Sequence, residues 1–374
     1  MKTTQPSLPA KNNSADLRVV LYIAGALLLF LLALDLMVAS LQQLGGTVAQ
    51  VILLATANPF AGLFIGLLLT AMLQSSSTTT ALVVAFVASG ALSLGSAVPI
   101  IMGANVGTTI TAMIVSIGFI SRKKEFKRAV AAGSSHFFFN LLTAAVIFPL
   151  EYHYHLLSRF SAAVAGSVTH TQQAPALPVS WDGFDTLADL LTSVAPLPFL
   201  WAAVALILLF SSILIFRKLV ADLLKARSPE AFSRFFFKNA YKSFGWGLLT
   251  TAAIRSSTIT TSIVVPIVAK KIATLRQAAP FILGANVGTT ITAFIAALVH
   301  GYTVEVVSIA VAHFLFNLAG VLIFLPVPVL RKSLLWLSAG FGKMTAEHRL
   351  AGFLFLLFTF FLVPFFLIFL NQRH

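Results

Sequence analysis

The sequence predicts an all-α polytopic membrane protein with two repeats of opposite orientation. Three observations support this: the composition, the lengths of the apolar segments, and a string that occurs twice. Of 374 residues, 58% are hydrophobic and only 10% are charged, and the mean hydropathy is +0.95. A soluble domain carries about 25% charged residues. This chain therefore has too few charges to cover a soluble surface.

The charged residues set the expected orientation. The net charge of +14 would suit nucleic acid binding, but in a membrane protein it indicates basic cytoplasmic loops, and we expect no nucleic acid partner. The segment 151–198 holds one Arg and several acids, which places it outside. Absence of cysteine excludes disulfides and thiolate chemistry. The basic residues cluster at Lys2, Lys11 and Arg18 and in residues 122–128, 217–242, 270–276 and 331–349.

The apolar segments, taken in order, predict the membrane crossings. The first, at residues 19–41, is too long for a signal peptide and leads from a cytoplasmic N-terminus to the outside. Further crossings are expected at residues 97–119, 129–150, 199–217, 277–299, 307–326 and 350–370.

Two pairs of shorter segments flank polar strings. Segments 60–73 and 78–93 flank QSSS, and segments 245–254 and 259–269 lie around RSSTITTS. A crossing needs about 20 residues, and all four segments are shorter. Each pair therefore predicts a re-entrant helical hairpin with a polar tip. The first hairpin is expected to enter from the outside and the second from the cytoplasm.

The hairpins belong to a longer repeated pattern. The string GANVGTTITA occurs at 103–112 and again at 284–293, and HFFFN at 136–140 returns as HFLFN at 313–317. The threading places the two copies in opposite orientations, which is typical of secondary transporters with a site at the repeat interface. The predicted division is 1–61, N-terminal tail and first helix; 62–149, transport repeat 1; 150–242, extracytoplasmic loop, linking helix and basic loop; 243–326, transport repeat 2; and 327–374, C-terminal helix region.

The polar strings suggest an ion site near the bilayer centre. Two glycines four residues apart with an Asn between them form helix poorly, so we expect each GANVG helix to be broken there. A helix that starts at a hairpin tip presents free N–H groups to an anion. Hydroxyls can donate to the same anion and offer oxygen to sodium. The alternative is that the GxxxG spacing packs helices and that the Ser and Thr hydroxyls bond back to their own helices.

Other polar residues have less specific roles. His136 and Asn140, and likewise His313 and Asn317, stand four residues apart on one helical face and are expected to be structural or gating residues, with ligation of an ion as the alternative. Asp35 is an intramembrane acid with an expected structural or gating role.

Arg255 occupies the second hairpin tip, where the first has Gln74. It could bind a tetrahedral oxyanion with two parallel hydrogen bonds. It could also replace one bound cation, or extend to nearby water.

QSSST at 74–78, GANVGTTIT in both halves and HFFFN resemble the type II sodium-dependent phosphate cotransporter family, in a bacterial inner-membrane member without a soluble C-terminal regulatory domain. The resemblance covers both repeats and implies a multi-pass membrane protein in which sodium is cotransported with inorganic phosphate. Its oligomeric state is left open, with a homodimer as one option. The expected substrate-binding residues are Gln74, Ser75, Ser76, Ser77, Asn105, Arg255, Ser256, Ser257, Thr258 and Asn286. The expected sodium ligands are Ser76, Ser77, Thr78, Asn105, Thr108, Thr109, Ser257, Thr258, Asn286, Thr289 and Thr290.

The residues also rank the function classes. No GxxxxGK[ST] string is present, which argues against direct use of ATP. A site of neutral oxygens would bind sodium more strongly beside a bound anion, which favours sodium-coupled alternating access. A passive or differently coupled oxyanion channel or transporter is the alternative. A membrane enzyme acting on a phosphorylated lipid is disfavoured because no carboxylate is placed to orient the histidines, so we expect no enzyme.

Overall fold

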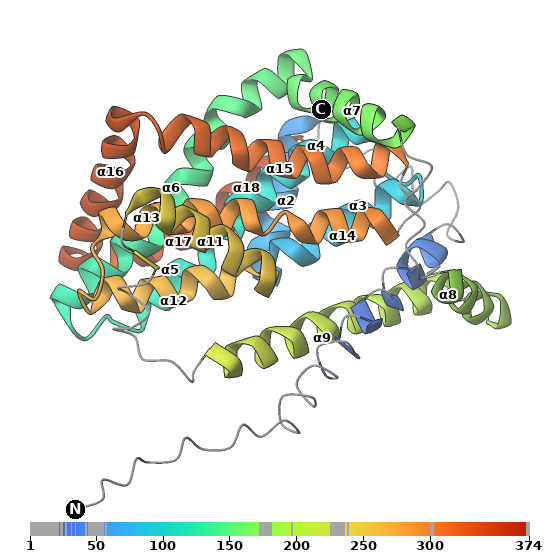
Figure 1. Ribbon diagram of the computed structural model, residues 1–374, viewed down its shortest axis with the longest axis horizontal. Helices are drawn as coiled ribbons and strands as arrows, with labels where there is room; N and C mark the ends of the chain where they lie inside the picture. The colour runs from blue at the N-terminus through green and yellow to red at the C-terminus, as the bar shows by residue number, and fades with distance from the viewer. Residues whose placement is uncertain are drawn as a thin grey trace, which may run out of the picture.

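The computed structural model is helical throughout the part of the chain it describes (Figure 1). The described residues are 58–171, 182–195, 197–224, 236–237, 239–299 and 303–371, together with part of 22–43 and Thr56. Among them, five stretches are long and apolar enough to cross a membrane, with mean hydropathies from 1.5 to 2.9. The predicted class, an all-α polytopic membrane protein, is confirmed. The basic cluster at Lys2, Lys11 and Arg18 lies outside the described residues.

The first half of the core contains a helical hairpin, an interrupted helix and a long helix. The hairpin agrees with the predicted arms, except that its second helix ends at Ala88 and not near residue 93. The long helix begins at Lys123, so the basic cluster at 122–128 forms its first turns and not a loop. The elements are α2 (Pro59–Leu73), α3 (Ser76–Ala88), α4 (Leu94–Gly107), α5 (Ile110–Ile117) and α6 (Lys123–Tyr154).

The second half repeats these elements in the same order. Its hairpin is followed by an interrupted helix and then by a helix that carries HFLFN. The contacts between the halves are also reciprocal. Helix α3 of the first half packs against α14 of the second, and α12, the counterpart of α3, packs against α5, the counterpart of α14. The elements are α11 (Ala240–Ile254), α12 (Ser257–Ala269), α13 (Leu275–Gly288), α14 (Ile291–Val299) and α15 (Val304–Phe324). Opposite orientation of the halves in the membrane stays a prediction.

The glycines of the doubled string pack helices and do not break them. Helix α4 continues through Gly103 to Gly107, and α13 continues through Gly284 to Gly288. A Cβ on Gly103 would lie 1.8 Å from the carbonyl oxygen of Leu63, and one on Gly284 would lie 2.0 Å from that of Phe244. The expected break at GANVG is therefore wrong. Small residues here allow the backbones of two helices to touch.

The interruption falls later, at the paired threonines. Thr109 donates its backbone N–H to Val106, and Thr290 donates to Val287, each spanning three residues. Such bonds tighten one turn without unwinding the chain. The helix therefore changes from α4 to α5, and from α13 to α14, through a short turn that keeps most backbone groups satisfied.

The segment expected as one long loop, 151–198, contains helices. Glu151 at the end of α6 is buried and accepts hydrogen bonds from the backbone N–H groups of Leu157 and Ser158. A carboxylate at that position stabilises the N-terminus of α7. The helices between the halves are α7 (Leu156–Thr171), α8 (Asp182–Val194) and α9 (Pro198–Leu224), and α7 packs against α15.

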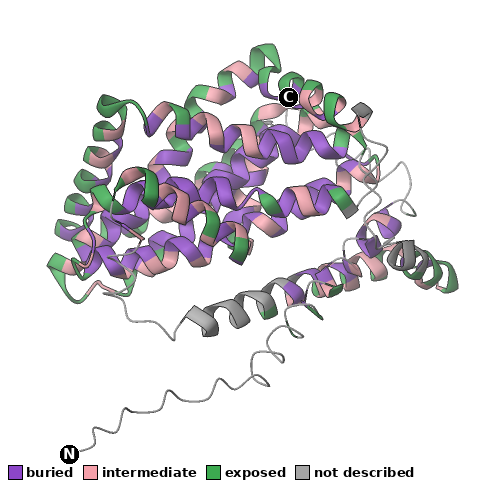
Figure 2. Ribbon diagram, viewed as in Figure 1, coloured by how far each residue is buried: buried purple, intermediate pink, exposed green. Residues whose placement is uncertain are grey.

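The C-terminal region presents apolar side chains outward. Phe365, Phe366 and Leu370 are more than half exposed. Figure 2 shows burial concentrated in the central helices, whereas outer helices such as α16 carry most of the exposed positions. An apolar surface of this kind suits contact with lipid chains. The elements are α16 (Pro328–Glu347), α17 (Arg349–Leu357), a π-helical turn η1 (Phe358–Leu362) and α18 (Val363–Asn371).

Candidate functional site

Each hairpin tip has the same local geometry. Gln74 ends α2 and Arg255 ends α11, both with left-handed backbone, at φ 53° and φ 56°. The next residues, Ser75 and Ser256, are extended and cap the following helices by accepting the backbone N–H groups of Thr78 and Ile259. A side chain in the left-handed region costs about 1–2 kcal/mol. Such strain at equivalent positions of both tips is a reason to look for function there.

The two tips contact each other reciprocally. The Ser77 hydroxyl donates to the carbonyl oxygen of Arg255 at 3.2 Å, and the Thr258 hydroxyl donates to that of Gln74 at 3.5 Å. Ser77 and Thr258 hold equivalent places in the two strings, so exchanging the halves maps one contact onto the other. The N-termini of α3 and α12 are thereby brought together.

A second reciprocal contact links the doubled string of one half to the His-Asn pair of the other. The Asn286 side-chain oxygen accepts from His136 Nε2 at 3.0 Å and from Asn140 Nδ2 at 3.1 Å. The Asn105 side-chain oxygen likewise accepts from His313 Nε2 at 3.2 Å and from Asn317 Nδ2 at 3.1 Å.

The asparagine amides fix the direction of these bonds. Asn105 Nδ2 donates to the backbone of Ile101, and Asn286 Nδ2 donates to that of Ile282. The free end of each asparagine is therefore an oxygen, which can only accept. Each histidine must carry its proton on Nε2. The sequence indicated that His136 and His313 were structural or gating residues, but it gave no sign that they reach across to the other half.

Several buried oxygens near this contact have no hydrogen-bond partner among the described residues. They come in equivalent pairs: the hydroxyls of Thr108 and Thr289, and the side-chain oxygens of Asn140 and Asn317. Thr108 lies three residues after Asn105, on the same helical face. Uncharged oxygens of this kind are suitable ligands for sodium. Asn140 and Asn317 were expected to be structural or gating residues, with ligation of an ion as the alternative, and their free oxygens favour that alternative.

The other predicted residues fall into three groups. The hydroxyls of Thr109 and Thr290 bond back to Val106 and Val287, as the helix-bonding alternative expects. Ser76 and Ser257 begin the second hairpin helices and are buried, and the Thr78 hydroxyl donates to Ser75. Gln74 is exposed, Arg255 is partly buried and Asp35 is buried. The assignment of these hairpin and threonine residues as substrate or sodium ligands, and of Asp35 as a structural or gating residue, stays a prediction.

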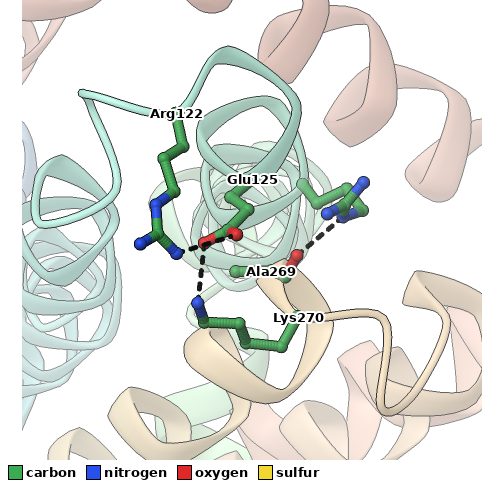
Figure 3. A network of polar contacts seen from close by, with 5 residues as sticks. Arg122, Glu125, Ala269 and Lys270 are labelled. Carbon is green, nitrogen blue, oxygen red and sulfur yellow. Dashed lines mark hydrogen bonds and ion pairs between the residues drawn. The ribbon is translucent and has the colours of Figure 1, made fainter.

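An ion-paired contact joins the halves where α6 begins and α12 ends. Glu125 in the first turn of α6 pairs with Lys270 at the end of α12 at 3.1 Å, and with Arg122 at 3.2 Å (Figure 3). Arg128 Nε donates to the backbone oxygen of Ala269, the last residue of α12. These contacts hold the second hairpin against the first half.

Comparisons with known proteins identify the family. The family model described as Na+/Pi-cotransporter matches residues 29–165 and 207–346, which make up more than half of the chain. The chain belongs to the Na+/Pi-cotransporter family. The two matched ranges include both hairpins and both copies of GANVGTTITA. Members of this family are transporters and not enzymes, and the chain is a multi-pass membrane protein.

Relatives within the Na+/Pi-cotransporter family extend over most of the chain. Sodium-dependent phosphate transport protein 2A of Ovis aries is 31% identical, over 90% of this chain and 65% of that protein. The Rattus norvegicus 2A protein is 30% identical, over 91% and 66%. The Homo sapiens 2B protein is 27% identical, over 92% and 64%. The chain thus spans slightly less than two thirds of these relatives. No solved structure matches it.

Proposed function

We propose that this chain is a secondary active transporter that couples sodium to the movement of inorganic phosphate by alternating access. The names of its relatives give both ions. The observation that carries the proposal is the reciprocal contact of the two hairpin tips through Ser77 and Thr258. It brings two helix N-termini and several hydroxyls to one place between two similar halves.

The tips would bind the phosphate. Helix N-termini favour an anion through their free N–H groups and dipole. Ser76 and Ser257 stand in the first turns of α3 and α12 and are buried. Their hydroxyls would donate to phosphate oxygens, and the partly buried Arg255 would add charge-assisted hydrogen bonds. Ser75 and Ser256 would act mainly by capping the helices that present these groups.

Sodium would bind to the uncharged oxygens behind the tips. Thr108, Thr289, Asn140 and Asn317 each offer a buried oxygen that has no partner among the described residues. Neutral ligands alone bind a cation weakly in a low-dielectric region. A phosphate bound nearby would strengthen sodium binding, and sodium would strengthen phosphate binding by the same factor. This mutual effect is the physical basis of coupling.

Purified protein in liposomes should take up labelled phosphate when an inward sodium gradient is present. Replacing sodium with choline should lower the apparent phosphate affinity and uptake about tenfold or more, which lies within the range of a typical coupling between two sites. Equal uptake in both media would contradict the proposal, and phosphate conductance that ignores the gradient would indicate a passive anion channel.

Arg255 provides a test of sodium stoichiometry. If its charge replaces one bound cation, Arg255→Gln should make the sodium dependence of uptake steeper, because an additional sodium ion would then balance the phosphate. The Hill coefficient for sodium measures this. Arg276→Gln is the matched control, since Arg276 is exposed at the start of α13. An unchanged coefficient with intact uptake would exclude the surrogate role.

A further inference from the structure

A basic cavity lies beside the ion-paired contact, away from the hairpin tips. Its volume is about 500 Å³, and it is bounded by the first turns of α6, by the end of α12 with the turn that follows, and by α16. Lys127, Arg128 and Lys271 contribute its charged groups. Apolar side chains such as Ala131, Val268 and Leu275 form most of the remaining wall.

The positive charge in this cavity is not neutralised within the described residues. Glu125 is the neighbouring acid, and its carboxylate is held by Arg122 and Lys270, neither of which lines the cavity. Lys127 and Lys271 form no ion pair in the part of the chain the structure describes. Arg128 uses Nε to bond the last backbone oxygen of α12, which fixes the guanidinium at the cavity wall.

Lys271 holds a strained backbone conformation. Its φ is +64°, in the left-handed region that favours glycine. The equivalent position of the first half, at the end of α3, is Gly90 with φ +78°. The turn therefore has the same shape in both halves, but only the second half places a lysine there. A side chain kept at an unfavourable position is a reason to look for function.

The equivalent surface of the other half serves as an internal comparison. Counting back from the His-Asn pairs, Arg128 corresponds to Glu305 and Lys127 to Val304. Gly90 stands in place of Lys271. The equivalent surface therefore has none of the three basic side chains of the cavity, and it carries one acid, Glu305. The positive cavity is thus a property of one end of the molecule and does not follow from the repeated fold.

We propose that this cavity binds the phosphate headgroup of an anionic phospholipid. Basic pockets between membrane helices bind such headgroups, and the largely apolar wall suits the glycerol backbone and first acyl carbons. A free phosphate ion would leave most of that wall without a partner. This site goes beyond the proposed transport function and does not depend on it.

The test uses full-length protein in detergent and native mass spectrometry. Phosphatidylglycerol is titrated as the probe, with phosphatidylcholine as the neutral reference lipid. The variant Lys127→Gln/Lys271→Gly removes two cavity charges, and the second change installs the residue that the first half already uses. The matched control, Lys123→Gln/Lys124→Gln, removes two charges from exposed positions on the same helix, outside the cavity.

The cavity variant should bind phosphatidylglycerol on the order of tenfold more weakly than the control variant, from the attraction of two basic side chains to an anionic headgroup. Phosphatidylcholine binding should be unchanged in both. If phosphatidylglycerol binding is weakened equally in both variants, or in neither, the proposed site is wrong and the lipid responds only to nonspecific surface charge. Displacement of phosphatidylglycerol by millimolar inorganic phosphate would overturn it in favour of a free-anion site.

Because Lys271→Gly relieves backbone strain, the variant is expected to fold. A thermal midpoint in detergent at or above that of the wild-type protein checks this before lipid is added. If the midpoint falls, phosphatidylglycerol binding is compared between the single variants Lys127→Gln, in the cavity, and Lys124→Gln, outside it. A smaller but still selective loss of phosphatidylglycerol binding is expected there, and equal binding by the two single variants would overturn the proposal.

Discussion

Gly103→Ala and Gly284→Ala are each expected to lower the yield of folded protein severely. In both, the added Cβ would lie at or within 2.0 Å of a backbone carbonyl oxygen on the hairpin helix. The Cβ is fixed by its own backbone and the carbonyl oxygen by the other, so no side-chain rotation relieves the clash. Helix α4 must therefore move away from α2, or α13 from α11. Overpacking costs typically 1–3 kcal/mol, and a contact this short should cost about 3 kcal/mol or more.

The control positions for this prediction lie on two of the same helices. A Cβ added at Gly95 on α4 or at Gly245 on α11 would have nothing within 4 Å, so alanine there should be neutral or slightly stabilising. Fluorescence-detected size exclusion and thermal unfolding compare the four variants. If Gly103→Ala and Gly95→Ala have equal midpoints, the close packing of α2 and α4 is not as described.

Asn105→Ala should destabilise the folded protein by about 2–4 kcal/mol and abolish transport, and Asn286→Ala should do the same. Each substitution leaves two buried donors of the other half without their acceptor, and an unsatisfied buried donor costs about 1–3 kcal/mol. For Asn105 these donors are His313 Nε2 and Asn317 Nδ2. Because the bonds join the two halves, their loss also loosens the proposed site. Unfolding in mixed detergent micelles measures the change.

Two comparisons separate this effect from the loss of any asparagine. Asn239→Ala removes the cap of α11, where the side chain accepts the N–H of Lys242, and a cap is worth about 1 kcal/mol. Asn317→Leu should lower the free energy of unfolding less in the Asn105→Ala background than in the wild-type protein. In that background it removes a donor that has already lost its acceptor. Strictly additive costs would show that the two side chains do not interact.

The tandem glycines illustrate how a correct motif can carry a wrong local interpretation. Glycine lowers helix propensity, which predicted a break at GANVG. In the structure those residues stay helical, because packing of α4 on α2 and of α13 on α11 outweighs propensity. The interruption falls instead at the Thr pair that follows. Sequence spacing could not separate the two outcomes, since both need small residues at the same positions.

The sequence alone determined that the chain is helical, lies in a membrane and repeats its hairpin and interrupted helix. These properties follow from composition, segment length and recurring strings, which are local. Only the tertiary structure decided which side chains meet: Ser77 with the carbonyl of Arg255, Asn105 with His313, Glu125 with Lys270. These partners lie more than a hundred residues apart in the chain, and nearly every face of an apolar helix looks alike in sequence. Their pairing depends on how whole helices pack, which no local pattern records.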